Sequence, residues 1–189
     1  MDKKLKKYIE RYDLVEDDET HELTPDGGMI LLVNKDTACE VHIADKSHKL
    51  DSFQSILMNP YEASVHITSS SKTLDLIAVR FKGAGASFFF DDKMDVLMQS
   101  PNEPIYLEDN ISEHALDTYF KDLLTPSKLP FNIMKIIDLL DEQGSNYSID
   151  EVLAIANVPR KVLDKMFSRK TGLTFKTYAM LKELDRGRR

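Results

Sequence analysis

The 189-residue sequence predicts an α+β protein, in which a β-rich N-terminal part comes before an all-helical C-terminal part. Three observations lead to this prediction. Short apolar runs separated by turn formers fill the first half, helical periodicity begins after Pro104, and the net charge changes sign after residue 144. A run of strands followed by a run of helices favours separate modules over an intermixed α/β fold.

The β-rich part is expected from about residue 20 to residue 108. Several short strands at a spacing of roughly 8–12 residues are typical of an all-β barrel or sandwich. Turn formers such as NKDT and ADKSHKLD separate the expected strands, and the glycines of FKGAGASFFF end the last one. Cys39 and Val41 alternate with Glu40 and His42, which indicates a sheet with one buried face. The expected strands are residues 28–33, 38–43, 54–58, 63–67 and 73–81.

Two amphipathic helices are expected next in the chain. Residues 110–124 have apolar side chains along one helical face, and Asn110 with Glu113 has the spacing of a capping box. After the breaker TPSKLP, residues 131–144 form the second helix, which Gly144 ends. We expect this segment to connect two domains and to be a candidate dimerisation surface.

The stretch SIDEVLAIANVPRKVLDKMFSRKTGLTFKTY (148–178) predicts two short helices joined by a tight turn. Ser148 and Glu151 form an S-x-x-E capping box, so the first helix begins at Ile149. Asn157 tolerates the left-handed backbone of a reversal, and Pro159 suits the first turn of a new helix. Gly172 then ends the second helix. The expected buried residues are Ile149, Val152, Leu153 and Ala156 in the first helix, and Val162, Leu163, Met166 and Phe167 in the second.

The charge is distributed unevenly along the chain. Residues 1–144 hold 15 Lys and Arg against 27 Asp and Glu (net −12), and residues 145–189 hold 10 against 5 (net +5), which together give −7. Such asymmetry indicates a basic binding module attached to an acidic one.

The second helix of the pair has a polar face that suits the major groove of DNA, where its N-terminal part would meet base edges. Basic side chains there can donate to guanine or to phosphate, and Asp164 can accept from a cytosine amine but repels phosphate. The alternative is a solvated basic face on a packed helix pair. The candidate DNA-binding residues are Arg160, Lys161, Asp164, Lys165 and Ser168, with Arg169 and Lys170 near phosphate.

The spacing S-x-x-E-V-L-A-I-A-N-V-P-x-x-x-L-x-x-x-F-x-x-x-x-G-L-T-x-x-x-Y resembles the first helix-turn-helix of AraC/XylS-type bacterial transcription regulators. TPDGGMILLV (24–33) and LIAVRFKGAGASFFF (76–90) are similar to the sensor domain that precedes such modules. The resemblance implies a cupin-like β-barrel at 1–108, a helical connector at 109–144 and a helix-turn-helix at 145–189. The family landmarks fall on Ala156, Asn157, Leu163, Phe167, Gly172 and Tyr178.

The sequence departs from the family pattern in three ways. Leu153 stands where the family has a small alanine, and Asn157 and Pro159 replace the glycine and serine of the usual turn. Members also have two helix-turn-helix units joined by a long helix, whereas FKTYAMLKELDRGRR begins that helix and reaches residue 189. The second unit is therefore expected to be missing.

The resemblance implies a cytoplasmic bacterial regulator that binds double-stranded DNA and a small-molecule effector. Each good base contact contributes only about 1–3 kcal/mol of discrimination, so one unit should bind weakly and a homodimer would restore two units. One alternative is a ligand-sensing or dimerising module that does not bind DNA by itself. Another is a metal-dependent cupin enzyme.

The candidate ligand pocket is the interior of the expected β-barrel, which side chains can fill or which can hold one small molecule. We expect Arg80 to face either inward, as an anion anchor, or outward to solvent. Core packing explains the apolar candidates equally well. The candidate pocket residues are Phe53, Met58, Tyr61, Arg80 and Phe81.

No catalytic residue, metal site or cofactor is expected. The sequence has no phosphate-binding loop and no nucleophile elbow, and His42, His48 and His66 form no His-x-His motif. Cys39, the single cysteine, is expected to be a buried strand residue. No apolar run has the length of a membrane span, and the N-terminus has no secretory signal, so we expect no membrane partner.

Overall fold

The computed structural model describes residues 1–17, 19–24, 28–58, 64–69, 71, 73–82, 85–90, 112–124, 135–140, 148–171 and 173–180. Strands come first and helices follow, which confirms the α+β prediction. The first elements are η1 (Leu5–Lys7), β1 (Ile9–Asp17), β2 (Thr20–Leu23), β3 (Ile30–Asn34), β4 (Cys39–Ile43), β5 (Lys46–Leu50) and β6 (Ser55–Met58). The later elements are β7 (Val65–Ser69), β8 (Leu74–Phe81), α1 (Ser87–Phe90), α3 (Glu113–Leu123), α5 (Ile149–Ala156) and α6 (Arg160–Thr171). Residues 135–140 and 175–180 are also helical.

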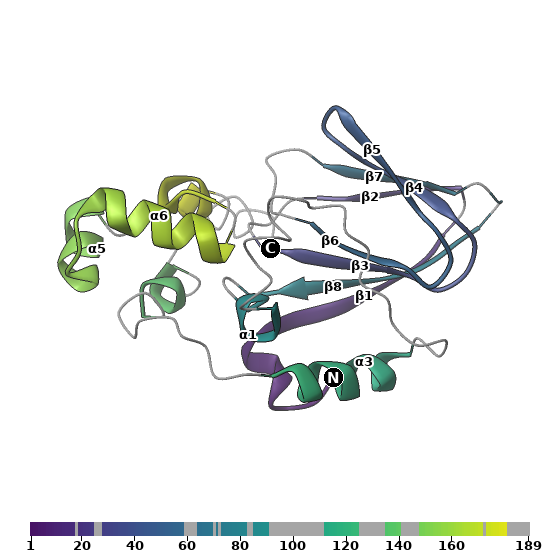
Figure 1. Ribbon diagram of the computed structural model, residues 1–189, viewed down its shortest axis with the longest axis horizontal. Helices are drawn as coiled ribbons and strands as arrows, with labels where there is room; N and C mark the ends of the chain where they lie inside the picture. The colour runs from purple at the N-terminus through teal and green to yellow at the C-terminus, as the bar shows by residue number, and fades with distance from the viewer. Residues whose placement is uncertain are drawn as a thin grey trace.

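The strands pair in two antiparallel sheets of four strands each, which lie one above the other (Figure 1). Sheet A has the order β1-β8-β3-β6, and sheet B has the order β2-β7-β4-β5. In the described part of the chain, no pairing joins the two sheets into a closed ring. The observed architecture is therefore a two-sheet sandwich, and the cupin-like barrel stays a prediction.

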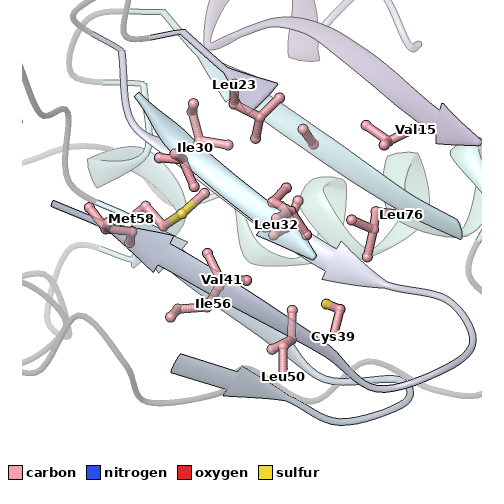
Figure 2. Close-up of a cluster of buried hydrophobic side chains, with 14 of the residues drawn as sticks. Val15, Leu23, Ile30, Leu32, Cys39, Val41, Leu50, Ile56, Met58 and Leu76 are labelled. Carbon is pink, nitrogen blue, oxygen red and sulfur yellow. The ribbon is translucent and has the colours of Figure 1, made fainter. Parts of the chain in front are cut away.

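Sheet A is covered on both faces, so it has two hydrophobic cores. One core lies between the two sheets, where side chains from both layers point toward one another (Figure 2). The other lies between sheet A and η1, α1 and α3. Successive strand residues point to opposite faces. In β8, Leu76 and Ala78 therefore face sheet B, whereas Ile77, Val79 and Phe81 face the helices.

The C-terminal helices have a third core that shares no residue with the other two. In Figure 1, α5 and α6 form a group to the left of the sheets, while α3 lies under sheet A. The connector is divided accordingly, because Leu116 and Phe120 of α3 pack on sheet A and residues 136, 137 and 140 pack with α5 and α6. The third core comprises Ile136, Ile137, Leu140, Val152, Ala156, Leu163, Phe167, Phe175, Tyr178 and Ala179.

The five predicted strands are present as β3, β4, β6, β7 and β8, with ends shifted by one or two residues. The expected start of the β-rich part was wrong, because β1 begins at Ile9. The segment ADKSHKLD, interpreted as a turn, contains strand β5. The missed strands, β1, β2 and β5, are all edge strands, which are paired on one side only and tolerate charged side chains.

The expected start of the first connector helix was also wrong. The N-cap of α3 is Ser112, whose hydroxyl accepts a hydrogen bond from the Ala115 N–H at 3.2 Å. Asn110, the predicted cap, and Gly144, the predicted stop of the second helix, lie outside the described residues. Among the described residues, no helical segment has the length and apolar composition of a membrane span.

Candidate functional site

The start of α5 and the turn between α5 and α6 both have the predicted local geometry. The Ser148 hydroxyl accepts the Glu151 N–H at 3.2 Å, and the Glu151 carboxylate accepts the Ser148 N–H at 2.7 Å, which completes the capping box. Asn157 has left-handed backbone (φ 51°, ψ 39°), and its N–H donates to the Leu153 carbonyl. The Pro159 carbonyl then accepts hydrogen bonds from the first turn of α6. The predicted reversal at Asn157 is therefore confirmed.

The two helices bury most of the predicted face. Leu163 and Phe167 are fully buried, and the Phe167 ring packs edge-on against Phe175 and Tyr178, with ring centroids 5.8 and 5.1 Å apart. Val162 is an exception, because 43% of its surface is exposed. It lies about 100° around the helix from Leu163, and the core closes on the Leu163 side. The prediction that Val162 is buried was therefore wrong.

The polar face of α6 is the candidate DNA-binding surface, and its cations reach solvent. Arg160, Lys161, Lys165 and Arg169 are exposed. Asp164 lies 3.9 Å from the Arg160 guanidinium and partly neutralises it.

Two further candidates on α6 differ from these exposed cations. The Ser168 hydroxyl donates to the Leu173 carbonyl at 3.2 Å, so its proton is already used within the chain. The side chain of Lys170 lies outside what the structure describes. Lys161, Lys165 and Arg169, which follow one another at intervals of four residues, are therefore the exposed basic row of α6.

The candidate pocket residues do not gather at one place. Met58 belongs to the core between the sheets, whereas Phe81 belongs to the core under the helices, on the opposite face of sheet A. Phe53 is 39% exposed and lies in the turn between β5 and β6 with φ 62°. Tyr61 lies outside the described residues. Core packing, the alternative kept open by the sequence, therefore explains Met58 and Phe81.

Arg80 faces inward, which decides between its two predicted orientations. It is only 5% exposed and lies on the face of β8 that is turned toward sheet B. Its Nε donates to Asp13 Oδ2 at 2.6 Å, and its Nη1 donates to the Thr24 carbonyl at 3.3 Å. The other oxygen of the Asp13 carboxylate accepts from Arg11 Nε at 2.8 Å. Arg80 therefore faces inward as an anion anchor, and its guanidinium binds the Asp13 carboxylate of the same chain.

The register of β1 on β8 explains this arrangement. Arg11 is directly opposite Arg80, and like charges in that relation repel unless an anion lies between them. A register shift between Ile9 and Arg11 distorts the strand next to this pair. Such bulges redirect side chains. The carboxylate–guanidinium cluster could not be predicted from the sequence, because β1 itself was not predicted.

The strand histidines lie closer together than the sequence indicated. The sheet register places His42 opposite His66, and His66 opposite Glu22, on the outer face of sheet B. His42 Nε2 lies 3.3 Å from the Thr68 hydroxyl and 3.5 Å from the Glu40 carboxylate. Even so, no group of three or more His, Cys, Asp or Glu in the described ranges is arranged to hold a metal ion.

Cys39 and His48 have environments that fit structural roles. Burial raises the pKa of the Cys39 thiol to about 11, so the thiol stays protonated at neutral pH. Partial burial, and then the charge of Lys46, lowers the pKa of His48.

Comparisons with known proteins show a similarity in structure rather than in sequence. No protein-family model and no curated protein matches the sequence. A 1.65 Å structure of ToxT from Vibrio cholerae matches with a TM-score of 0.54 and 12% identity, covering 93% of this chain and 81% of that chain.

Two ligand-bound structures of ToxT from the same organism are also similar. ToxT bound to (E)-4-(8-methylnaphthalen-1-yl)but-3-enoic acid matches with a TM-score of 0.56 and 11% identity, covering 93% and 81% of the two chains. ToxT with a bound unsaturated fatty acid matches with a TM-score of 0.56 and 10% identity, covering 95% and 79%. At these identities the comparison establishes a common fold along almost the whole of this chain.

Proposed function

We propose that the chain is a ligand-responsive transcription regulator of the AraC type, acting in the bacterial cytoplasm. Residues 1–108 form the effector-sensing domain, residues 109–144 connect it, and the helix pair within 145–189 contacts double-stranded DNA. The observation that supports this best is the exposed basic face of α6 on a separately packed helix pair.

Two independent lines support the same family. The spacing of residues 148–178 resembles the first helix-turn-helix of AraC-type regulators. The fold of almost the whole chain is similar to that of ToxT, which is an AraC-family regulator. The sequence match uses local spacing and the structural match uses the whole topology, so neither depends on the other.

Charge-reversal variants test the DNA-binding part of the proposal. Lys161→Glu combined with Lys165→Glu should weaken binding to a mixed-sequence duplex, because each lost phosphate contact costs about tenfold near 0.1 M salt. Fluorescence anisotropy of a labelled duplex measures this affinity. The matched control reverses Lys46 and Lys49, two exposed lysines of β5 in sheet B, and should leave binding much less affected. Equal losses in both variants would show that α6 is not the binding surface.

The effector proposed for Arg80 is an acid with an apolar body. The two ToxT ligands named above are both carboxylic acids with large apolar parts. In this chain, the buried Arg80 guanidinium already holds the Asp13 carboxylate beside the apolar core between the sheets. An incoming carboxylate would take the place of Asp13 on Arg80.

Oleic acid and its methyl ester are suitable probes for this site. The acid should bind at least about tenfold more tightly than the ester, because hydrogen bonds to charged groups contribute about 1.5–3 kcal/mol. Isothermal titration of the full chain measures both affinities, and Arg80→Gln should remove the preference. Equal binding of acid and ester would exclude Arg80 as the anchor.

The other functions weighed from the sequence are outcomes of the same experiments. A chain that binds the acid but no DNA is the ligand-sensing or dimerising module. The metal-dependent enzyme has no support from the similar structures reported above, which are of a regulator. Homodimerisation remains part of the proposal, because two copies would present two helix pairs to one DNA site.

A further inference from the structure

We infer that strand β1 couples the Arg80 site to the connector helix α3, through the adjacent residues Asp13 and Tyr12. The inference rests on the proposed function, because it assigns a route by which an effector at Arg80 changes the rest of the chain. Neighbouring residues of a strand point to opposite faces, so Asp13 and Tyr12 meet different parts of the molecule.

On the inner face of β1, Asp13 is bonded to the buried cation. Its carboxylate bridges Arg80, at 2.6 Å, and Arg11, at 2.8 Å. A buried charge that loses its partner is strongly destabilising. A ligand anion that occupies Arg80 supplies a new partner, and Asp13 then remains bonded to the exposed Arg11 alone. Binding at Arg80 therefore changes the position of Asp13 on β1.

On the outer face of β1, Tyr12 is bonded to α3. Its hydroxyl donates to Asp117 Oδ1 at 2.8 Å, and Asp117 is only 9% exposed. The ring packs at the margin of the core that contains Leu116 and Phe120 of α3. Those apolar contacts are not directional, whereas the hydrogen bond is a directional contact between β1 and α3. Ion pairs from Met1 to Asp117 and from Asp2 to Lys121 also hold α3, but they come from the residues before β1. Burial, and then the bond to Asp117, raises the pKa of Tyr12, so its hydroxyl remains a donor.

The position of β1 in the sheet allows it to move. It is an edge strand of sheet A, paired only with β8, and its register shifts between Ile9 and Arg11, close to Tyr12 and Asp13. By contrast, β8 is paired on both sides and buried on both faces. A change at Asp13 is therefore taken up by β1 rather than by β8. Tyr12 moves with Asp13 because one peptide unit joins them, and the bond to α3 weakens.

Hydrogen exchange of the full chain tests the coupling without DNA or effector. Asp13→Asn should speed exchange of the α3 amides at 117–123 by at least about twofold, because coupled neighbours affect one another by this much or more. Exchange in α5 should stay the same, because α5 belongs to a separate core. In a Tyr12→Phe background, adding Asp13→Asn should change the exchange rates of the α3 amides little further. If Asp13→Asn does not fold, Arg80→Lys provides the same perturbation with the charge kept.

Two results would overturn the inference. The first is an Asp13→Asn variant whose amides exchange faster in β1 but at the parent rate in α3. The second is a double variant whose α3 exchange rates change by the product of the changes seen in the Asp13→Asn and Tyr12→Phe single variants. The matched control is Asp75→Asn, which breaks the Lys35–Asp75 ion pair involving the opposite end of β8 and should leave α3 unchanged. Since neither DNA nor acid is present, failure of the coupling and failure of the proposed function are separate results.

Discussion

At the scale of single residues, the cluster of Arg11, Asp13 and Arg80 is the main charged feature that links β1 to β8. Two guanidiniums face each other across paired strands, and the carboxylate between them offsets their repulsion. Arg80 is almost fully buried, whereas Asp13 is partly exposed. Removing the Asp13 carboxylate should therefore cost more than breaking a surface ion pair, because the charge of Arg80 would remain buried.

Replacing the Asp13 carboxylate should reveal how much the burial of Arg80 adds to the cost. Asp13→Asn should lower the free energy of unfolding by about 1–3 kcal/mol, because it removes the carboxylate charge that the buried Arg80 guanidinium shares with Arg11, with part of the cost screened by solvent. Asp75→Asn, which breaks a more exposed pair with Lys35, should cost about 1 kcal/mol or less. Urea unfolding of the two variants makes the comparison, and equal losses would contradict the buried role of Arg80.

Asn157 is a second residue whose backbone determines local structure. Its φ of 51° lies in the left-handed region, where asparagine and glycine are tolerated better than alanine. Asn157→Ala should therefore destabilise the helix pair by about 1 kcal/mol, whereas Asn157→Gly should be nearly neutral. Thermal unfolding of the two variants tests the turn, and equal melting temperatures would show that the left-handed conformation is not needed.

At the scale of elements, the strands that the sequence did not predict are all charged edge strands, whereas the predicted strands are central or, like the edge strand β6, fully buried. Central strands such as β3 and β8 are buried on both faces, so their apolar runs are visible in the sequence. The edge strands β1, β2 and β5 contain many charged residues, which resemble turn or tail composition. The helix pair was visible because its caps and core spacing are local.

The candidate site was predictable only where its residues lie close together in the sequence. Residues 160–169 follow each other on one helix, so their common face could be inferred from spacing alone. The contacts of Arg80 and Tyr12 join residues 67 and 105 positions apart in the sequence. No periodicity links such residues, and the strand that contains Tyr12 and Asp13 was itself unrecognised.

The junction between β8 and α1 depends on one glycine. A Cβ on Gly85 would lie within 3 Å of the backbone of both Tyr8 and Lys82. Gly85→Ala should therefore destabilise the protein by roughly 1–3 kcal/mol, because backbone rather than a flexible side chain would have to move. Chemical denaturation measures the loss, and a variant as stable as the parent chain would show that this close approach is not needed.

The capping box of α5 should make that helix sensitive to acid. The hydrogen bonds from Ser148 lower the pKa of the Glu151 carboxyl below its usual value. A lowered folded-state pKa means that the stabilisation is complete above the unfolded value, about 4.5, and is lost as the pH falls below it. Between pH 5 and pH 3, the parent chain should lose more α5 protection from hydrogen exchange than Glu151→Gln loses. Identical pH profiles would contradict the capping role.

At the scale of the whole molecule, an acidic sandwich and a basic helix pair are joined by a connector whose helices pack with different parts. Helix α3 belongs to the core of sheet A, and residues 136–140 contribute to the core of the helix pair. Under the proposed function, an effector would therefore act on α3 without disturbing the packing of α6. The proposed regulator needs such a division, because its DNA-contacting surface would stay intact while its presentation changes.

The salt dependence of DNA binding by the full chain tests the central claim most directly. Affinity for a mixed-sequence duplex should fall steeply and linearly, on logarithmic axes, as salt rises. Lys161→Gln with Lys165→Gln should make the slope shallower by about 2, one unit for each lost phosphate contact. No binding at low salt, or an unchanged slope in this variant, would contradict the claim that α6 of this chain contacts DNA.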